Sequence, residues 1–182
     1  MARRLSMREA DTGDRHGLWR LHTRSISSLC RGAYSAQEVS TWVDLLRPEA
    51  YMPVDPPRTV LVAEWEDELV GFGQLDPVRG ELEALYVSPE TVGHGVGSAL
   101  LCALEALAWG AQARTLNLDA SLNAESFYRA RGYVPLHAAR RVLTPEVQLV
   151  CTRMQKRGPG RLHPTGAGMG EAAAPRPGAA RR

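Results

Sequence analysis

Three glycines alternate in the segment Val92-Gly93-His94-Gly95-Val96-Gly97-Ser98, directly before an apolar run over 99–109. Because glycine has no Cβ, such a loop can turn tightly and bring its backbone N–H groups against a ligand. The N-terminus of the helix that follows favours an anion. We therefore interpret the segment as a phosphate-binding loop formed by Gly93, His94, Gly95, Val96, Gly97 and Ser98. A tight turn that needs glycine only for its geometry is the simpler alternative.

Two common phosphate-binding patterns fit this loop poorly. A nucleoside triphosphate loop ends in Gly-Lys followed by Ser or Thr, but here Gly97 is followed by Ser98 and no lysine is near. A dinucleotide fingerprint needs a third glycine where Ser98 stands, although Asp119 lies near the distance expected of its ribose-binding carboxylate. A dehydrogenase remains the competing enzymatic hypothesis. It is weakened because helices and a hairpin precede the loop over 1–80.

The surrounding pattern predicts a mixed α/β chain. Asp11 and Asp14 are typical helix-start residues, Ser35 and Glu38 have capping-box spacing, and Pro48 and the prolines of 53–57 should end the second helix. The acidic turn Glu66-Asp67-Glu68 separates two strand-like runs and indicates a hairpin. We expect strands over 5–8, 59–65, 69–75, 81–87 and 116–119, and helices over 14–29, 35–46 and 99–109.

Two motifs carry a family resemblance. Leu85-Tyr86-Val87-Ser88-Pro89 precedes the glycine loop, and Asn123-Ala124-Glu125-Ser126-Phe127-Tyr128-Arg129-Ala130-Arg131-Gly132-Tyr133 follows it. Together they resemble the GNAT superfamily of N-acyltransferases that use acyl-coenzyme A, closely over 69–133 and in element order over 5–154. Val92 departs from the family pattern, which usually has glutamine or arginine there. The resemblance implies a GNAT-like fold: an α/β, mixed and splayed central sheet of six or seven strands with about four helices.

The resemblance also implies a coenzyme site. Acetyl-CoA, as co-substrate, would lie in the cleft where two central strands separate, with its pyrophosphate on the glycine loop. Backbone N–H groups near Tyr86 and Val87, after Leu85, would hold the pantetheine arm and polarise the thioester carbonyl. Asn123 would cap its helix through its side chain and touch the coenzyme. No metal is required.

Catalytic roles follow from the same resemblance. The reaction would be direct attack of an amine on the thioester, with Tyr128 as the general acid that protonates the departing thiolate. Strand alternation predicts that Glu81 and Glu83 share one face with Leu85 and Val87. We expect Glu81 to be the general base, with Glu83 in reserve and Asp119 as a third candidate.

The acceptor is expected to be a primary amine of a small molecule or a peptide, bound by the region 29–57 and the last strands. A non-catalytic acyl-CoA-binding module that serves as a sensor or interaction partner is the alternative. The resemblance leaves open whether the protein is a homodimer.

Composition bounds these hypotheses. The 182 residues are 44% hydrophobic and 23% charged, which suits one domain, and the net charge of +2 does not favour a specific nucleic acid or a membrane as partner. The region 156–182 is rich in Gly, Ala, Pro and Arg, with a net charge of +5, and we predict a disordered tail. The domain over 1–155 then carries −3, which slightly favours a cationic amine. Cys30, Cys102 and Cys151 form no CxxC pair, so we expect a cytoplasmic protein.

Overall fold

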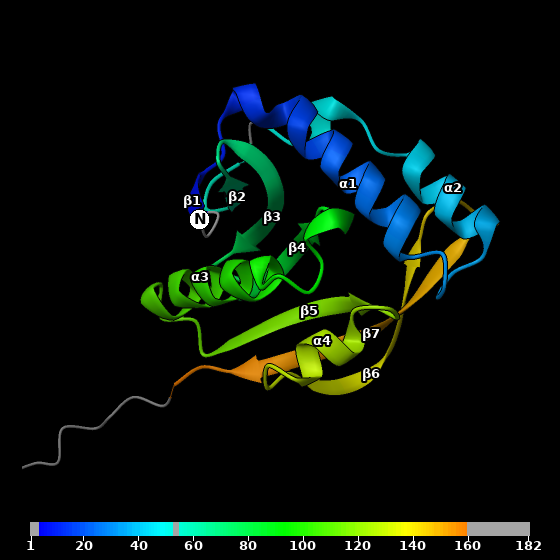
Figure 1. The fold of residues 1–182 in the computed structure, drawn as a ribbon. Helices are drawn as coiled ribbons and strands as arrows, with labels where there is room; N and C mark the ends of the chain where they lie inside the picture. The colour runs from blue at the N-terminus through cyan, green and yellow to red at the C-terminus, as the bar shows by residue number, and fades with distance from the viewer. Residues whose placement is uncertain (1–3, 53–54, 160–182) are drawn as a thin grey trace, which may run out of the picture.

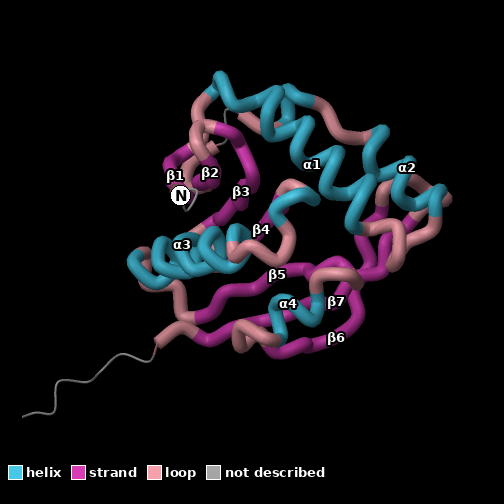
Figure 2. The backbone as a smooth tube through the Cα atoms, viewed as in Figure 1, coloured by secondary structure: helices cyan, strands magenta, loops and turns pink. Residues whose placement is uncertain are grey.

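The computed structural model describes residues 4–52 and 55–159 of the chain. In this part of the chain, seven strands form one mixed sheet in the order β1-β2-β3-β4-β5-β7-β6 (Figures 1 and 2). With four α-helices, this architecture confirms the expected fold class. The strands are β1 Leu5–Glu9, β2 Thr59–Trp65, β3 Glu68–Asp76, β4 Glu81–Val87, β5 Thr115–Ser121, β6 Val134–Val142 and β7 Gln148–Arg157.

The first two helices begin within one residue of the positions that the sequence signals predict. The Ser35 hydroxyl accepts the Glu38 N–H at 3.2 Å, and the Glu38 carboxylate accepts the Ser35 N–H at 2.8 Å, so the predicted capping box is confirmed. Pro53, one of the predicted helix-ending prolines, lies outside the described residues. The α-helices are α1 Arg15–Leu29, α2 Ala36–Asp44, α3 Val96–Gly110 and α4 Glu125–Arg129, and the short 3₁₀ helices are η1 Thr12–Asp14, η2 Pro48–Ala50 and η3 Pro89–Thr91.

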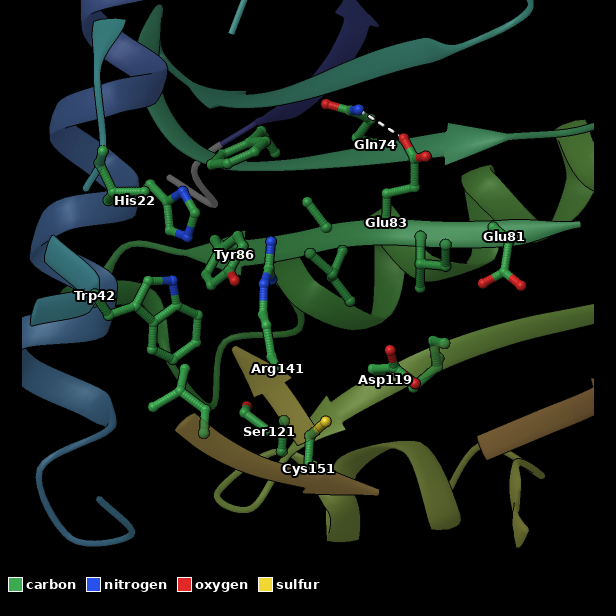
Figure 3. Close-up of a pocket in the computed structure, with 18 of the residues that line it drawn as sticks. His22, Trp42, Gln74, Glu81, Glu83, Tyr86, Asp119, Ser121, Arg141 and Cys151 are labelled. Carbon is green, nitrogen blue, oxygen red and sulfur yellow. Dashed lines mark hydrogen bonds between the residues drawn. The ribbon is translucent and has the colours of Figure 1, made fainter. Parts of the chain in front are cut away.

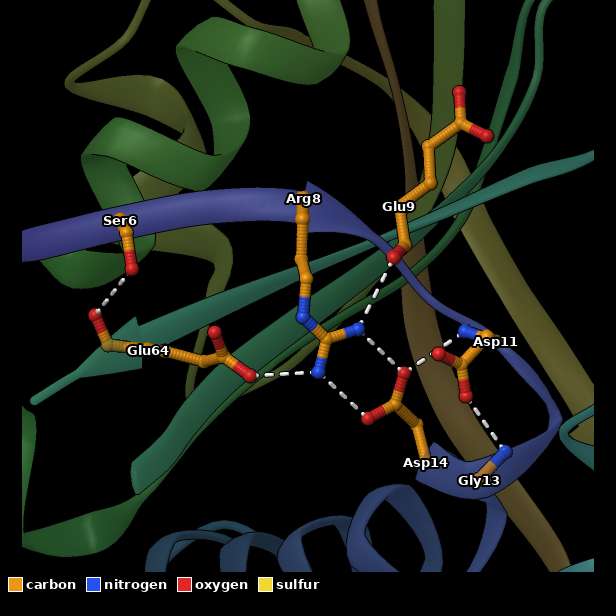
Figure 4. A network of polar contacts seen from close by, with 7 residues as sticks. All are labelled: Ser6, Arg8, Glu9, Asp11, Gly13, Asp14 and Glu64. Atoms are coloured by element: carbon orange, nitrogen blue, oxygen red, sulfur yellow. Dashed lines mark hydrogen bonds and ion pairs between the residues drawn. The ribbon is translucent and has the colours of Figure 1, made fainter. Parts of the chain in front are cut away.

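A polar network ties β1 to the start of α1 (Figure 4). The Arg8 guanidinium lies 2.7 Å from the Asp14 carboxylate and 2.6 Å from the Glu64 carboxylate on β2. The hydrogen bond from Arg8 holds the pKa of Asp14 below its usual value. Asp11 caps η1 through its own side chain, as its helix-start role predicts. These contacts fix the direction in which α1 leaves the sheet.

Each face of the sheet packs against one long helix. On one face Leu100 and Leu104 of α3 lie in a buried cluster with Leu75 and Leu116. On the other face Leu18 and Leu21 of α1 pack with Phe72 and other strand residues. The predicted hairpin joins β2 to β3 through Glu66 and Asp67, which adopt left-handed φ angles of 49° and 69°. The helices thus hold the first four strands between two apolar layers.

The sheet splays between β4 and β5. These strands run parallel and pair only at Glu81 and Asn117, near the start of each strand. From there β5 follows β7 along its whole length, from Thr115 to Ser121. Figure 1 shows β4 and β5 separating toward their C-terminal ends. A cleft can therefore open at the end of β4, as the family resemblance implied.

A β-bulge in β4 corrects one sequence expectation. Gln74 of β3 pairs with Ala84, but the next residue, Leu75, pairs with Leu82, so Glu83 is an extra residue. Beyond the bulge the alternation of side chains between the two faces of the sheet changes phase. The prediction that Glu81 and Glu83 share one face with Leu85 and Val87 was therefore wrong. The side chains of Leu85 and Val87 pack with the α3 cluster, whereas Ala84 and Tyr86 pack with the α1 cluster and Glu83 contacts Gln74.

The last strand extends past the expected domain boundary. Lys156 and Arg157 belong to β7, and the Lys156 ammonium lies 2.7 Å from the Glu105 carboxylate on α3. The rest of the expected tail, over 160–182, lies outside the described residues. Cys30, Cys102 and Cys151 are all free thiols. In residues 4–52 and 55–159, no helix has the length and apolarity needed to cross a membrane.

Candidate active site

A cavity of about 1000 Å³ opens at the splay, between β4 and β5 and beside α1 and α2 (Figure 3). Aromatic rings form much of its wall. Glu81, Glu83, Asp119 and Tyr128 also line it, so the structure brings the expected base candidates and the expected acid into one site. The aromatic lining residues are His22, Tyr34, Trp42, Tyr51, Phe72, Tyr86 and Tyr128.

The cavity edge of β4 offers backbone donors. The Ser88 N–H donates to the Val70 carbonyl of β3 at 2.8 Å. Because N–H groups of successive strand residues point to opposite sides, those of Leu85 and Val87 point away from β3, toward the splay. The described part of β5 pairs with β4 only at Glu81, so these two groups have no strand partner. They can donate to a ligand that lies along β4.

The glycine loop is open where a ligand would approach. Gly93 and Gly95 have left-handed φ angles of 82° and 85°, and beyond the adjacent residues no atom lies within 4 Å of where a Cβ would stand on either. Gly95 is the N-cap of α3, and its carbonyl accepts the Ala99 N–H at 3.0 Å. The N–H groups of Val96, Gly97 and Ser98 therefore precede the first helical hydrogen bond and remain available to an anion.

Arg131 adds positive charge beside this loop, and the sequence reasoning missed it. Its guanidinium lies 3.7 Å from the centre of the Phe127 ring and donates to the Ser98 hydroxyl and, at 2.8 Å, to the Phe127 carbonyl. Its place within the second motif was an available signal. His94 is exposed, with its Nδ1 3.1 Å from the Val92 carbonyl oxygen. A phosphate on the loop would meet Arg131 as well as the helix N-terminus.

Tyr128 reaches the cavity from α4. Its side chain is buried between Phe127 and Tyr133, with ring centres 5.1 and 5.5 Å away. Burial raises the pKa of the Tyr128 hydroxyl above its usual value near 10. The hydroxyl is therefore protonated at neutral pH, the state required of a proton donor.

The three carboxylates expected as bases all contact arginine. Glu81 forms an ion pair with Arg153 of β7, and the same guanidinium lies 3.3 Å from Asp119. Glu83 accepts hydrogen bonds from Arg58 at 2.9 Å and Gln74 at 2.7 Å. The three predicted carboxylates thus line the cavity, but each forms an ion pair with an arginine.

Asn123 differs from its expected helix-capping role. α4 begins after Ala124, and no side chain caps its first turn. The Ala124 N–H instead donates to the Ser121 carbonyl at 2.9 Å, which closes a turn before the helix. The Asn123 side-chain oxygen lies 3.6 Å from the Cys30 thiol. The prediction of a side-chain cap was therefore wrong.

His22 of α1 is a site residue that the sequence reasoning missed. Its ring centre lies 3.7 Å from that of Tyr86, and its Nδ1 lies 2.8 Å from the Tyr51 hydroxyl oxygen. Its Nε2 is buried and has no hydrogen-bond partner among the described residues. Burial, with a smaller effect from Arg141, lowers the pKa of His22 to about 3. Its spacing four residues after buried Leu18 placed it on the apolar face of α1 and was a usable signal.

Arg141 of β6 also went unrecognised. Figure 3 shows its side chain pointing across the cavity toward Tyr86. Its positive charge lowers the pKa of His22 and opposes the rise in the pKa of Tyr86 that burial causes. Arg141 forms no ion pair with any described residue. Two adjacent arginines in an edge strand, Arg140 and Arg141, were the available signal.

Among residues 4–52 and 55–159, no group of three or more His, Cys, Asp or Glu side chains is arranged to hold a metal ion.

Comparisons with known proteins agree on one family. Residues 30–156 match the model of the acetyltransferase (GNAT) domain. A GCN5-related N-acetyltransferase from Rhodopseudomonas palustris is 29% identical, with a TM-score of 0.79 over 86% of this chain and 98% of that one. No curated protein matches the chain.

Two further solved structures share the fold. The PaiA N-acetyltransferase of Thermoplasma acidophilum, in complex with coenzyme A, is 20% identical, with a TM-score of 0.68 over 85% of this chain and 99% of that one. YncA of Salmonella typhimurium, solved with its cofactor acetyl-CoA, is 19% identical, with a TM-score of 0.59 over 95% and 98%. The family match covers well over half of the sequence, and the chain belongs to the GNAT acetyltransferase family.

Proposed function

We propose that this protein transfers an acetyl group from acetyl-CoA to a primary amine of a small molecule or peptide. The observation that supports this most is the unpaired edge of β4, where the N–H groups of Leu85 and Val87 face the splay between the open glycine loop and Tyr128. Family membership favours this activity over the competing dehydrogenase hypothesis. The free cysteines suit a reducing compartment, and we expect the cytoplasm.

The site fits the coenzyme at both ends. The N–H groups of 96–98 and the guanidinium of Arg131 would hold the pyrophosphate, since both favour an anion and the space before Gly93 and Gly95 is open. The N–H groups of Leu85 and Val87 would hold the pantetheine arm and the thioester oxygen. Acetyl-CoA supplies the activated acetyl group.

Two residues of the cavity would carry out the proton transfers, one as an acid and one as a base. As the acceptor nitrogen bonds to the acetyl carbon and the carbon–sulfur bond breaks, Tyr128 donates its phenolic proton to the departing sulfur. Its raised pKa keeps that proton in place until the sulfur develops charge. Glu81 accepts the proton that the amine loses, with Glu83 as the second candidate. The products are the N-acetylated amine and free coenzyme A.

The experiment that tests this function is an amine screen with the purified protein. Acetyl-CoA binding is measured by calorimetry, with NAD as the comparison ligand, and free thiol release is followed with each amine. We expect acetyl-CoA to bind, NAD not to bind, and thiol release to depend on a subset of the amines. Binding of NAD without binding of acetyl-CoA would overturn the proposal.

The contacts of the carboxylates favour a second candidate function. Glu81, Glu83 and Asp119 all contact arginine, which is what a site without a working base would show. The protein would then bind acyl-CoA as a sensor or interaction module. Tight acetyl-CoA binding with no amine-dependent thiol release would support this function instead of the first.

A further inference from the structure

The acceptor side of the cavity carries more positive than negative charge, although the domain as a whole is mildly acidic. Six arginines and four carboxylates line it. Two of these arginines, Arg58 and Arg153, account for three of the carboxylates through ion pairs. Arg47 donates to the backbone carbonyls of Asp44 and Leu46. The remaining lining arginines, Arg79, Arg140 and Arg141, have no ion pair within the described residues.

Arg141 is the unpaired arginine that reaches the interior of the cavity. Its partner in the β6–β7 ladder is Leu149, which is buried with Trp42 against α2. The partner of Arg140 is Val150, which is 37% exposed, so the two arginines leave β6 on opposite faces. The charge of Arg141 acts on the pKa values of His22, Tyr86 and Cys151, which all line the cavity.

The surroundings of Arg141 specify what it can bind. The rings of Trp42 and Tyr86, with the buried Phe72 ring packed beside Tyr86, form an apolar wall for the body of a ligand. A guanidinium beside such a wall is suited to a planar carboxylate, which it can hold with two parallel hydrogen bonds. The Arg141 side chain is exposed in the structure, so a ligand that covers it would strengthen this charged contact by excluding water.

We propose that the acceptor is an amino acid with an apolar side chain and a free carboxylate, and that Arg141 binds that carboxylate. This inference rests on the proposed acetyltransferase function and names its substrate class. Tyr86 immediately precedes Val87, whose N–H would hold the thioester oxygen. A carboxylate bound to Arg141 would therefore lie close to the thioester carbonyl. The amine of the acceptor can reach that carbonyl only if it is separated from its own carboxylate by a short spacing, as in an amino acid.

The test compares matched sets of amines that differ at the carboxylate alone. For leucine and for phenylalanine, the free acid, the carboxamide and the decarboxylated amine are offered to the full-length protein. Thiol release gives kcat/KM, and calorimetry with and without coenzyme A gives acceptor binding independently of turnover. The carboxamides have less basic amines, so more of their nitrogen is unprotonated at neutral pH. A preference for the free acid therefore cannot arise from amine protonation.

Three variants locate the effect. Arg141→Gln removes the charge, Arg141→Lys keeps it without the paired geometry, and Arg20→Gln removes an exposed arginine of α1 outside the cavity. We expect the wild type to prefer at least one free acid over its carboxamide by tenfold or more, on the order expected for a charge-assisted contact. Arg141→Gln should abolish this preference, Arg141→Lys should retain part of it, and Arg20→Gln should leave it intact. None of the variants should change the KM for acetyl-CoA.

The outcomes separate this inference from the function on which it rests. Absence of acetyl-CoA binding contradicts the acetyltransferase function, whereas the calorimetric comparison of acid with carboxamide still decides the carboxylate site. The inference is overturned if both carboxamides bind and react as well as their acids. It is equally overturned if Arg141→Gln weakens acids and carboxamides to the same extent.

Discussion

His22 shows how strongly the cavity changes the chemistry of a single side chain. An exposed histidine would change its charge near neutral pH, but this ring lies against Tyr86 with its Nε2 out of contact with water. Burial lowers its pKa from 6.5 to about 3. The imidazole is therefore neutral at the pH where the enzyme would act, and its Nδ1 and Nε2 can serve in hydrogen bonding rather than as a charge.

This shift predicts that acid destabilises the fold through His22. Below pH 6.5 the unfolded chain binds a proton that the folded chain does not, so the free energy of unfolding falls as the pH drops toward about 3. The contribution is up to about 1.4 kcal/mol per pH unit in that range. Urea unfolding at pH 7 and pH 5 should show a smaller loss for His22→Phe than for the wild type. An equal loss in both proteins would contradict the assigned shift.

A comparison of two variants tests which carboxylate is the base. If Glu81 accepts the amine proton, Glu81→Gln should lower kcat by 10²-fold or more, the range of general base catalysis. Glu83→Gln should cost less, because its amide can still pair with Gln74. The pH profile of kcat/KM for both variants makes the comparison. A larger loss for Glu83→Gln would reverse the two roles.

At the scale of elements, two irregularities create the site. The bulge at Glu83 turns Tyr86 to the α1 side of the sheet and Val87 to the α3 side. The loss of pairing after Glu81 then leaves the edge of β4 free beside the N-terminus of α3. A regular sheet would have satisfied these backbone groups and closed the cleft.

The α3 N-terminus gives a prediction for coenzyme binding. Gly95→Ala places a Cβ at a φ of +85°, which an L-residue rarely adopts, in the open space where the pyrophosphate would lie. We expect at least a tenfold rise in the Kd for acetyl-CoA and a loss of about 1 kcal/mol in stability. Gly110→Ala, at the other end of the same helix and also open at its Cβ position, is the matched control. Equal affinities for the two variants would argue against coenzyme binding at this loop.

Much of this framework could be predicted from local signals in the sequence. The Ser35–Glu38 cap, the turn at Glu66 and Asp67, and the bounds of β2 and β4 all depend on residues that are near neighbours along the chain. The bulge depends on how β3 pairs with β4, which the local sequence does not show. Strict alternation therefore predicted correctly that Glu81 and Glu83 share a face, but wrongly that Leu85 shares it too. The side chain of Asn123 does not cap α4, because the chain forms a turn there in which the Ala124 N–H donates to the Ser121 carbonyl.

Which residues meet in the cavity could not be predicted from the sequence. Arg141 meets Tyr86 and His22 only after β6, β4 and α1 come together, and no local pattern connects them. The ion pairs from Arg58 to Glu83 and from Arg153 to Glu81 likewise join distant segments. Overall charge does not describe the cavity, because the domain is mildly acidic while three arginines that line the cavity have no ion pair within the described residues.

At the scale of the whole molecule, the contacts at the end of β7 set how far the C-terminus can be truncated without loss of the domain's stability. Arg157 pairs with Thr115, and the Gly158 N–H donates to the Arg114 carbonyl at 2.9 Å. A chain that ends at Pro159 should keep these contacts and bind acetyl-CoA with the Kd of the full chain. A chain that ends at Gln155 loses the Lys156–Glu105 contact and should unfold at lower urea concentration. Weaker acetyl-CoA binding by the chain that ends at Pro159 would show that 160–182 take part in the site.

We propose that the cavity at the splay catalyses acetyl transfer with Tyr128 as its acid. The most direct test is amine-dependent thiol release from acetyl-CoA by Tyr128→Phe, with Tyr133→Phe as the control because it removes a neighbouring buried hydroxyl outside the cavity. We expect Tyr128→Phe to lower kcat by 10²-fold or more while acetyl-CoA binds unchanged, and Tyr133→Phe to keep most of its activity. An undiminished kcat in Tyr128→Phe would contradict the role of Tyr128 as the acid.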